Sequence, residues 1–212
     1  MTNQTKQVLI VATGNSGKVK EFVHALSSQD TIVKSMADYP DIPEVIEDGL
    51  TFAENARKKA KTVGDVLGLR VLADDSGLCV DQLEGRPGVY SARYAGEHAS
   101  DAENNEKLLH DLAELSLGED TEQPLLSPAR FVCHLALYDP ATGEFTEAEG
   151  TVEGMIVSEP VGQGGFGYDP LFYLSKYDKT MAQLTMQEKQ AISHRGEALR
   201  LLQQKLGIHP SS

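Results

Sequence analysis

The feature that most constrains this chain is a strand, a glycine-containing loop and a helix in direct succession at its N-terminal end. The apolar run QVLIVA at 7–12 predicts a buried strand, and TGNSGK at 13–18 follows it. Apolar residues then recur at helical spacing, at Val19, Phe22, Val23 and Leu26. Such a βα unit gathers backbone N–H groups at a helix N-terminus, so we predict an anion site to which Lys18 adds a charge. The loop is not a Walker A motif, because only two residues separate its glycines, and an ordinary βα turn remains the alternative.

A second polar stretch follows another apolar run, Val71-Leu72-Ala73. We predict a buried strand that ends in Asp74-Asp75-Ser76-Gly77, at the rim of a sheet where α/β proteins place ligands. Consecutive strand side chains point to opposite faces, so only one of the two aspartates should face a given cleft. A polar turn that caps the strand is the alternative, and it explains one aspartate better than two.

Three capping boxes mark helix starts, at 51–54, 100–103 and 185–188. The first opens a helix to about Leu67, which follows an exposed acidic loop ending at Glu47 and Asp48. Asn55 and Lys59 are four apart on that helix and share one face. From spacing alone we interpret this face as solvated.

Glycines surround two aromatic residues and an acid at 162–170, GQGGFGYDP. Glycine lets a backbone approach a ligand closely, and an exposed phenylalanine offers a stacking face, although a flexible hairpin loop is the alternative. Residues 130–138 and 144–156 predict an antiparallel pair of strands, and residues 118–129 predict a mobile surface loop.

Composition excludes several classes of protein. The formal net charge of −13 argues against a nucleic-acid polymer as partner, but it leaves room for a nucleotide held by local lysines and Mg²⁺. We expect no membrane span, because there is no long apolar run, and no secretory signal at the N-terminus. Cys79 and Cys133 lie in apolar runs and suggest core thiols in a reducing compartment, and the six histidines show no zinc spacing.

Taken together, the motifs make the sequence resemble the inosine triphosphate pyrophosphatase-like family. The resemblance covers nearly the whole chain, through TGNSGKVKEF (13–22), EDGLTFAENARKKA (47–60), ADDSGLCVDQLEGRPGVYSARYAG (73–96), GGFGYDPLF (164–172) and EKQAISHRGEAL (188–199). Asp48 departs from the family, where threonine is frequent at this position.

The resemblance implies a single α/β domain over residues 1–212, with a long mixed central sheet flanked by helices and two lobes with a cleft between them. It further implies a cytoplasmic homodimer that hydrolyses ITP, dITP and XTP to the nucleoside monophosphate and pyrophosphate with Mg²⁺. Glu47 and Asp75 would hold the metal, Asp75 would also be the general base, and Ser76 would contact substrate. The triphosphate would be bound by Thr13, Gly14, Asn15, Ser16, Gly17 and Lys18. The nucleotide site would be completed by Phe166, Gly167, Tyr168, Asp169, Lys189, His194 and Arg195.

Two other functions compete with this interpretation. A non-catalytic nucleotide-binding module would keep the glycine loops and lose the metal carboxylates, yet Glu47, Asp74 and Asp75 are all present. A pyrophosphatase for modified pyrimidine nucleotides, as in the Maf-like proteins, would have a different base pocket. The sequence leaves open whether Asp74 is a metal ligand or only orients one.

Overall fold

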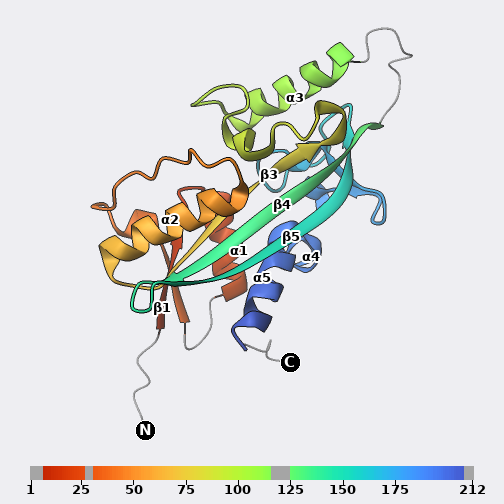
Figure 1. Cartoon of the computed structure of the whole chain (residues 1–212). Helices are drawn as coiled ribbons and strands as arrows, with labels where there is room; N and C mark the ends of the chain where they lie inside the picture. The colour runs from red at the N-terminus through yellow and green to blue at the C-terminus, as the bar shows by residue number, and fades with distance from the viewer. Residues whose placement is uncertain (1–6, 27–30, 116–124, 208–212) are drawn as a thin grey trace. The chain divides into compact units, whose positions relative to one another are not determined.

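The computed structural model describes residues 7–26, 31–115 and 125–207 (Figure 1). Seven strands form one sheet in the order β2-β1-β3-β4-β5-β6-β7. They are β1 (Gln7–Ala12), β2 (Thr31–Ser35), β3 (Val71–Val80), β4 (Leu125–Asp139), β5 (Glu144–Val157), β6 (Phe172–Leu174) and β7 (Lys179–Thr180). The α-helices are α1 (Ser16–Leu26), α2 (Phe52–Leu67), α3 (Asp101–Leu115), α4 (Met186–Ile192) and α5 (His194–Lys205).

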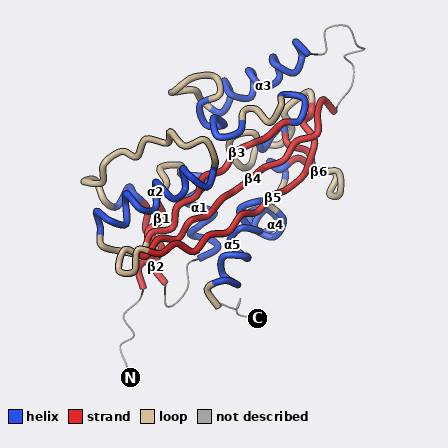
Figure 2. The backbone as a smooth tube through the Cα atoms, viewed as in Figure 1, coloured by secondary structure: helices blue, strands red, loops and turns tan. Residues whose placement is uncertain are grey.

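The sheet is mixed, which confirms the predicted α/β class with a long mixed sheet and flanking helices (Figure 2). β1 pairs in parallel with β2 and β3, whereas β6 pairs antiparallel with β5 and β7. The neighbours β4 and β5 are joined by the short turn at 140–143, so they run antiparallel as predicted. Among the described residues, no helix is long and apolar enough to cross a membrane.

The chain divides into two compact units. Unit 1 comprises residues 1–75, 133–150 and 195–212, and unit 2 comprises residues 76–132 and 151–194. Three strands, β3, β4 and β5, run from one unit into the other, so the boundary cuts through strands and not through linkers.

Unit 1 has a hydrophobic core on each face of its part of the sheet. One core joins Val11 and Leu72 to residues of α1 and α5, and the other joins Ile10, Val71 and Ala73 to residues of α2. The members alternate along β1 and β3 because successive strand side chains point to opposite faces. Unit 2 has a single core cluster, built on Leu78, Val80, Leu108, Leu112, Phe131, Ile156 and Phe172.

Two boundary predictions are wrong. β3 does not end in the polar stretch 74–77 but continues to Val80, because the carboxylates of Asp74 and Asp75 are paired and Leu78 and Val80 beyond them are buried. Residues 125–129 belong to β4 and not to a surface loop, since Ser127 and Ala129 are buried, while residues 118–124 lie outside the described residues.

Two of the three predicted capping boxes, at 100–103 and 185–188, are formed in both directions. At 51–54 the side chain of Glu54 instead accepts a hydrogen bond from the backbone N–H of Leu50. Thr51, Ser100 and Thr185 each accept a hydrogen bond from the residue three positions later. Neither cysteine forms a disulfide, and Cys133 is buried as predicted for a core thiol, whereas Cys79 is partly exposed. Burial raises the pKa of the Cys133 thiol to about 12.

Candidate active site

The predicted site residues fall in both units, and the structure describes each set within its own unit. Unit 1 holds the glycine loop, the two carboxylates predicted to bind the metal, and Arg195. Unit 2 holds Ser76, the 166–169 segment, Lys189 and His194.

Asp74 and Asp75 lie in the middle of a continuous strand. The alternation that places Leu72 with α1 and α5, and Ala73 with α2, continues through them. Asp74 is therefore paired with residues of α1 and α5, and Asp75 with residues of α2. The prediction that the two aspartates face different surroundings is confirmed.

Asp74 lies in a buried cluster of alternating charge. Its carboxylate is fully buried, 2.9 Å from Nζ of Lys18, and it accepts a hydrogen bond of 3.0 Å from Nη2 of Arg195. Nη1 of Arg195 donates to the carboxylate of Glu21, which lies beside Phe22 on the buried face of α1. We call Lys18, Glu21, Asp74 and Arg195 the Asp74 cluster.

The opposite charges of the Asp74 cluster stabilise one another's ionised forms. Burial alone would raise the pKa of Asp74, but the positive charges of Lys18 and Arg195 lower this pKa well below its usual range. Burial likewise opposes the charge of Arg195, yet Asp74 and Glu21 hold its pKa above the usual value. Asp74 is thus a permanent carboxylate at any pH near neutrality.

Asp75 has a different set of partners. Its Oδ2 accepts a hydrogen bond of 2.9 Å from the amide of Asn55, and its Oδ1 lies 3.8 Å from Nζ of Lys59. The same ammonium lies 3.0 Å from Glu47. We call Glu47, Asn55, Lys59 and Asp75 the Asp75 cluster.

Asn55 also fixes the loop that carries Glu47. Its Oδ1 accepts a hydrogen bond of 2.8 Å from the backbone N–H of Gly49. A Cβ at position 49 would come within 2.6 Å of that oxygen, so this approach requires glycine. One amide side chain therefore positions both carboxylates of the Asp75 cluster.

The pKa values of Asp75 and Lys59 are both raised. Burial raises the pKa of Asp75, and Glu47 adds to this, whereas Lys59, Lys18 and Asn55 offset it only in part. Burial opposes the charge of Lys59, but Asp75, Asp74 and Glu47 outweigh it and raise the pKa of its ammonium. Lys59 therefore remains an ammonium, whereas Asp75 takes up a proton more readily than an ordinary aspartate.

The prediction of a solvated face for Asn55 and Lys59 is wrong, because their side chains reach Asp75. They are 1% and 7% exposed. A signal was present in the sequence, since each lies directly before a residue of the apolar stripe of α2, Ala56 and Ala60. Glu21 gave the same signal through its neighbour Phe22.

The glycine loop at 13–18 leads into α1 as predicted. Asn15 caps the helix, because its Oδ1 accepts a hydrogen bond of 3.0 Å from the backbone N–H of Lys18. Residues 14–16 are exposed at the N-terminus of α1, which is the place where a helix favours an anion.

In unit 2, Lys189 joins the aromatic and acidic residues of the glycine-rich segment. Its Nζ lies 2.6 Å from Asp169 and 4.5 Å from the centroid of the Phe166 ring. Lys189 is buried, as is His194, whose ring stacks on Phe131 at a centroid distance of 4.9 Å. Ser76 lies half-buried on β3.

The residues fit a magnesium ion by their chemistry. Glu47 and Asp75 offer two carboxylates close to one ammonium, so positive charge is already favoured between them. Mg²⁺ prefers one or two carboxylates, with waters and substrate phosphates completing its shell. A small protein ligand set is therefore sufficient here.

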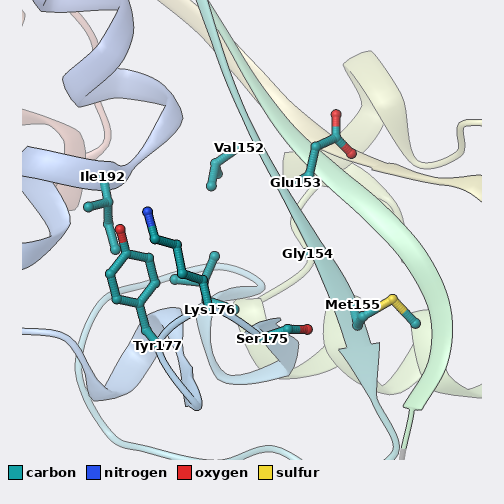
Figure 3. A pocket seen from close by; sticks show the side chains of 9 residues that line it. Val152, Glu153, Gly154, Met155, Ser175, Lys176, Tyr177 and Ile192 are labelled. Atoms are coloured by element: carbon teal, nitrogen blue, oxygen red, sulfur yellow. The ribbon is translucent and has the colours of Figure 1, made fainter.

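Unit 2 also has a pocket of about 430 Å³, lined by residues 152–155, residues 174–177 and Ile192 (Figure 3). None of the predicted site residues lines it. We do not assign this pocket to the candidate site.

Comparisons with known proteins cover nearly the whole chain. A model of the Ham1 family matches residues 9–205. A protein of Geobacter sulfurreducens named dITP/XTP pyrophosphatase is 50% identical over 199 residues, 94% of this chain and 96% of that protein. One of the same name from Halalkalibacterium halodurans is 50% identical over 193 residues, 91% and 95% of the two chains.

Solved structures agree with this match. The Ham1 protein of Staphylococcus aureus is 42% identical, with a TM-score of 0.79 over 95% of this chain and 98% of that one. A HAM1 protein of Coxiella burnetii is 38% identical, with a TM-score of 0.82 over 96% and 100%.

Proposed function

The chain belongs to the Ham1 family, and from this premise we propose that it hydrolyses the non-standard purine nucleoside triphosphates dITP, XTP and ITP to the monophosphate and pyrophosphate. The family match confirms the resemblance found in the motifs, and relatives with half of the sequence identical are named dITP/XTP pyrophosphatase. The single observation that carries the proposal is the Asp75 cluster, in which Lys59 lies within 4 Å of both Asp75 and Glu47.

In the proposed reaction, the oxygen of a water attacks the α-phosphorus of the substrate. The bond from that phosphorus to the bridging oxygen of the β-phosphate breaks, and pyrophosphate leaves. The proton of the water passes to Asp75, which is the proposed general base. Asn55 holds one oxygen of Asp75 in place, so the carboxylate need not reorient.

Positive charge for the phosphates comes from unit 1. We assign the triphosphate to Lys18, Lys59 and the N–H groups at the start of α1. Magnesium, held by Glu47 and Asp75, would neutralise phosphate charge and ease deprotonation of a bound water. In this proposal Asp74 is not a ligand but orients Lys18 and Arg195.

We assign the base to unit 2. Phe166 offers a ring for stacking, which contributes about 1–3 kcal/mol in comparable protein–base contacts. Buried His194 is the proposed donor to the 6-oxo group, which adenine lacks. The hydrogen bonds described for Arg195 go to the carboxylates of Glu21 and Asp74, so we place it in the Asp74 cluster and not against the base.

The experiment is a panel of nucleotides with Mg²⁺, comparing ITP, dITP and XTP with GTP, ATP and a modified pyrimidine triphosphate, and measuring pyrophosphate and orthophosphate separately. We expect pyrophosphate from the first three, little from ATP, and loss of the reaction with a chelator. Binding without hydrolysis would instead support the non-catalytic module, and preference for the pyrimidine would support a Maf-like function. We further propose a cytoplasmic homodimer, and light scattering on the purified protein tests the dimer.

A further inference from the structure

The backbone of Gly167 is held by two side chains of α3, both within unit 2. Oδ2 of Asp101 accepts a hydrogen bond of 2.7 Å from its N–H, and Nδ2 of Asn105 donates one of 3.1 Å to its carbonyl. Gly167 has a φ of 62°, a conformation that residues other than glycine rarely adopt. Helix α3 therefore fixes both the N–H and the carbonyl of Gly167.

The spacing along α3 explains how one helix reaches both groups. Residues four apart lie on the same face, so Asp101 and Asn105 point the same way. Asn104 shows that this end of the helix is used for such contacts, because its side chain bonds the backbone of Ala92 and Ala95 at 3.2 and 2.8 Å.

Stability alone does not account for Asn105. Its Oδ1 is buried and accepts no hydrogen bond within the described part of the chain. A buried acceptor without a donor opposes folding, so what the side chain contributes is its bond to Gly167.

A fixed Gly167 restrains its neighbour Phe166. The N–H of Phe166 donates a hydrogen bond of 2.9 Å to Asp169, and Lys189 binds the same carboxylate while lying over the ring. Tyr168 is anchored as well, because its hydroxyl donates to the carbonyl of Ser91 at 2.8 Å. The segment 166–169 is therefore a turn whose Tyr168 and Asp169 are bonded to Ser91 and Lys189, while α3 fixes the backbone of Gly167.

We propose that Asp101 and Asn105 are positioning residues of the nucleobase segment, which act through Gly167 to hold the ring of Phe166 ready for the base. This inference rests on the proposed function. A segment ordered in advance loses less conformational entropy when the nucleotide binds. Loss of the attachment weakens the substrate complex and the transition state equally, so KM rises and kcat stays.

The test compares Asp101→Ala with Asp101→Asn, whose side-chain oxygen can still accept from Gly167, and adds Asn105→Ala. Glu106→Ala is the matched control, since Glu106 is an exposed carboxylate on the same helix. We expect KM for dITP to rise about five- to tenfold in both alanine variants, with kcat within about twofold and the dITP/ATP ratio unchanged. Asp101→Asn and Glu106→Ala should match wild type.

Hydrogen exchange of a peptide covering 162–169 gives a readout that needs no substrate. We expect faster exchange in Asp101→Ala and wild-type exchange in Asp101→Asn. Unchanged exchange in Asp101→Ala would overturn the attachment, and faster exchange with an unchanged KM would overturn its role in binding. A wild-type protein that releases no pyrophosphate would overturn the proposed function and the positioning role with it, while the exchange data would still show whether α3 holds the segment.

Discussion

Asp74 and Asp75 are neighbours in sequence and chemically identical, yet folding shifts their pKa values in opposite directions. Asp74 faces two cations, Lys18 and Arg195, and its pKa falls. Asp75 shares one cation with Glu47, and its pKa rises. The comparison teaches that the direction of each carboxylate's pKa shift is set by the helix it meets, and that the alternation of side chains along the strand decides which helix that is.

The largest expected effect is on turnover in Asp75→Asn. The amide cannot accept a proton, so pyrophosphate release should fall by about two to four powers of ten while the fold stays intact. Steady-state assays with ITP measure the loss of turnover, and circular dichroism checks that the fold is intact. Asp48→Asn is the control, because it makes the same change at an exposed carboxylate that pairs with Lys58. Near wild-type turnover in Asp75→Asn would show that the base is elsewhere.

Asp74→Asn should instead act on stability. Removing one partner of a buried ion pair leaves the others uncompensated, and the free energy of unfolding should fall by about 3–5 kcal/mol. Urea unfolding at neutral pH measures the loss. A change below about 1 kcal/mol would mean that the Asp74 cluster does not hold unit 1 together.

Two adjacent lysines of α2 sharpen the contrast. Lys59 is buried in the Asp75 cluster, whereas Lys58 forms an exposed pair with Asp48. Lys59→Met should lower kcat/KM for ITP about ten- to hundredfold, because two carboxylates lose their shared cation. Lys58→Met should stay within about twofold, since exposed pairs contribute little. Equal effects of the two substitutions would remove Lys59 from the site.

The smallest expected effect is on the pH dependence of stability. The ionisation of Asp74 and that of Asp75 should change the free energy of unfolding with opposite sign. The pKa of Asp74 is lowered on folding, so its stabilisation is present above its usual value of 3.8 and is lost as pH falls through the folded pKa. The pKa of Asp75 is raised, so its favourable contribution is present below 3.8 and is lost as pH rises through the folded pKa. Urea unfolding between about pH 4 and pH 8 should show Asp75→Asn at least as stable as wild type at the upper end, and Asp74→Asn less stable there. The same sign for both variants would contradict the assignment.

The sequence predicted what depends on neighbours along the chain. Apolar runs and capping boxes identified β1, α2 and the start of α3, because these signals act over a few residues. It did not predict the length of β3 or the burial of Lys59. Charges inside a core are stable only with partners, and the partner of Asp74 lies 121 residues away at Arg195.

The same limit applied to the site. The motifs pointed to Glu47 and Asp75, but the roles of Asn55 and Asp101 depend on contacts made in the folded chain. Asn55 is 20 residues from Asp75, and Asp101 is 66 residues from Gly167. Periodicity describes one element at a time and cannot place two of them together.

The unbroken course of β3 has a consequence for how this protein can evolve. Its side chains alternate strictly, so inserting or deleting one residue just before Asp74 would exchange the two aspartates between the helices they meet. Asp75 would then lie on the side of Lys18 and Arg195, and Asp74 on the side of Asn55 and Lys59, each displaced along the strand from its present partners. A substitution of one aspartate should impair either activity or stability, whereas a change of one residue in length should impair both in the same step.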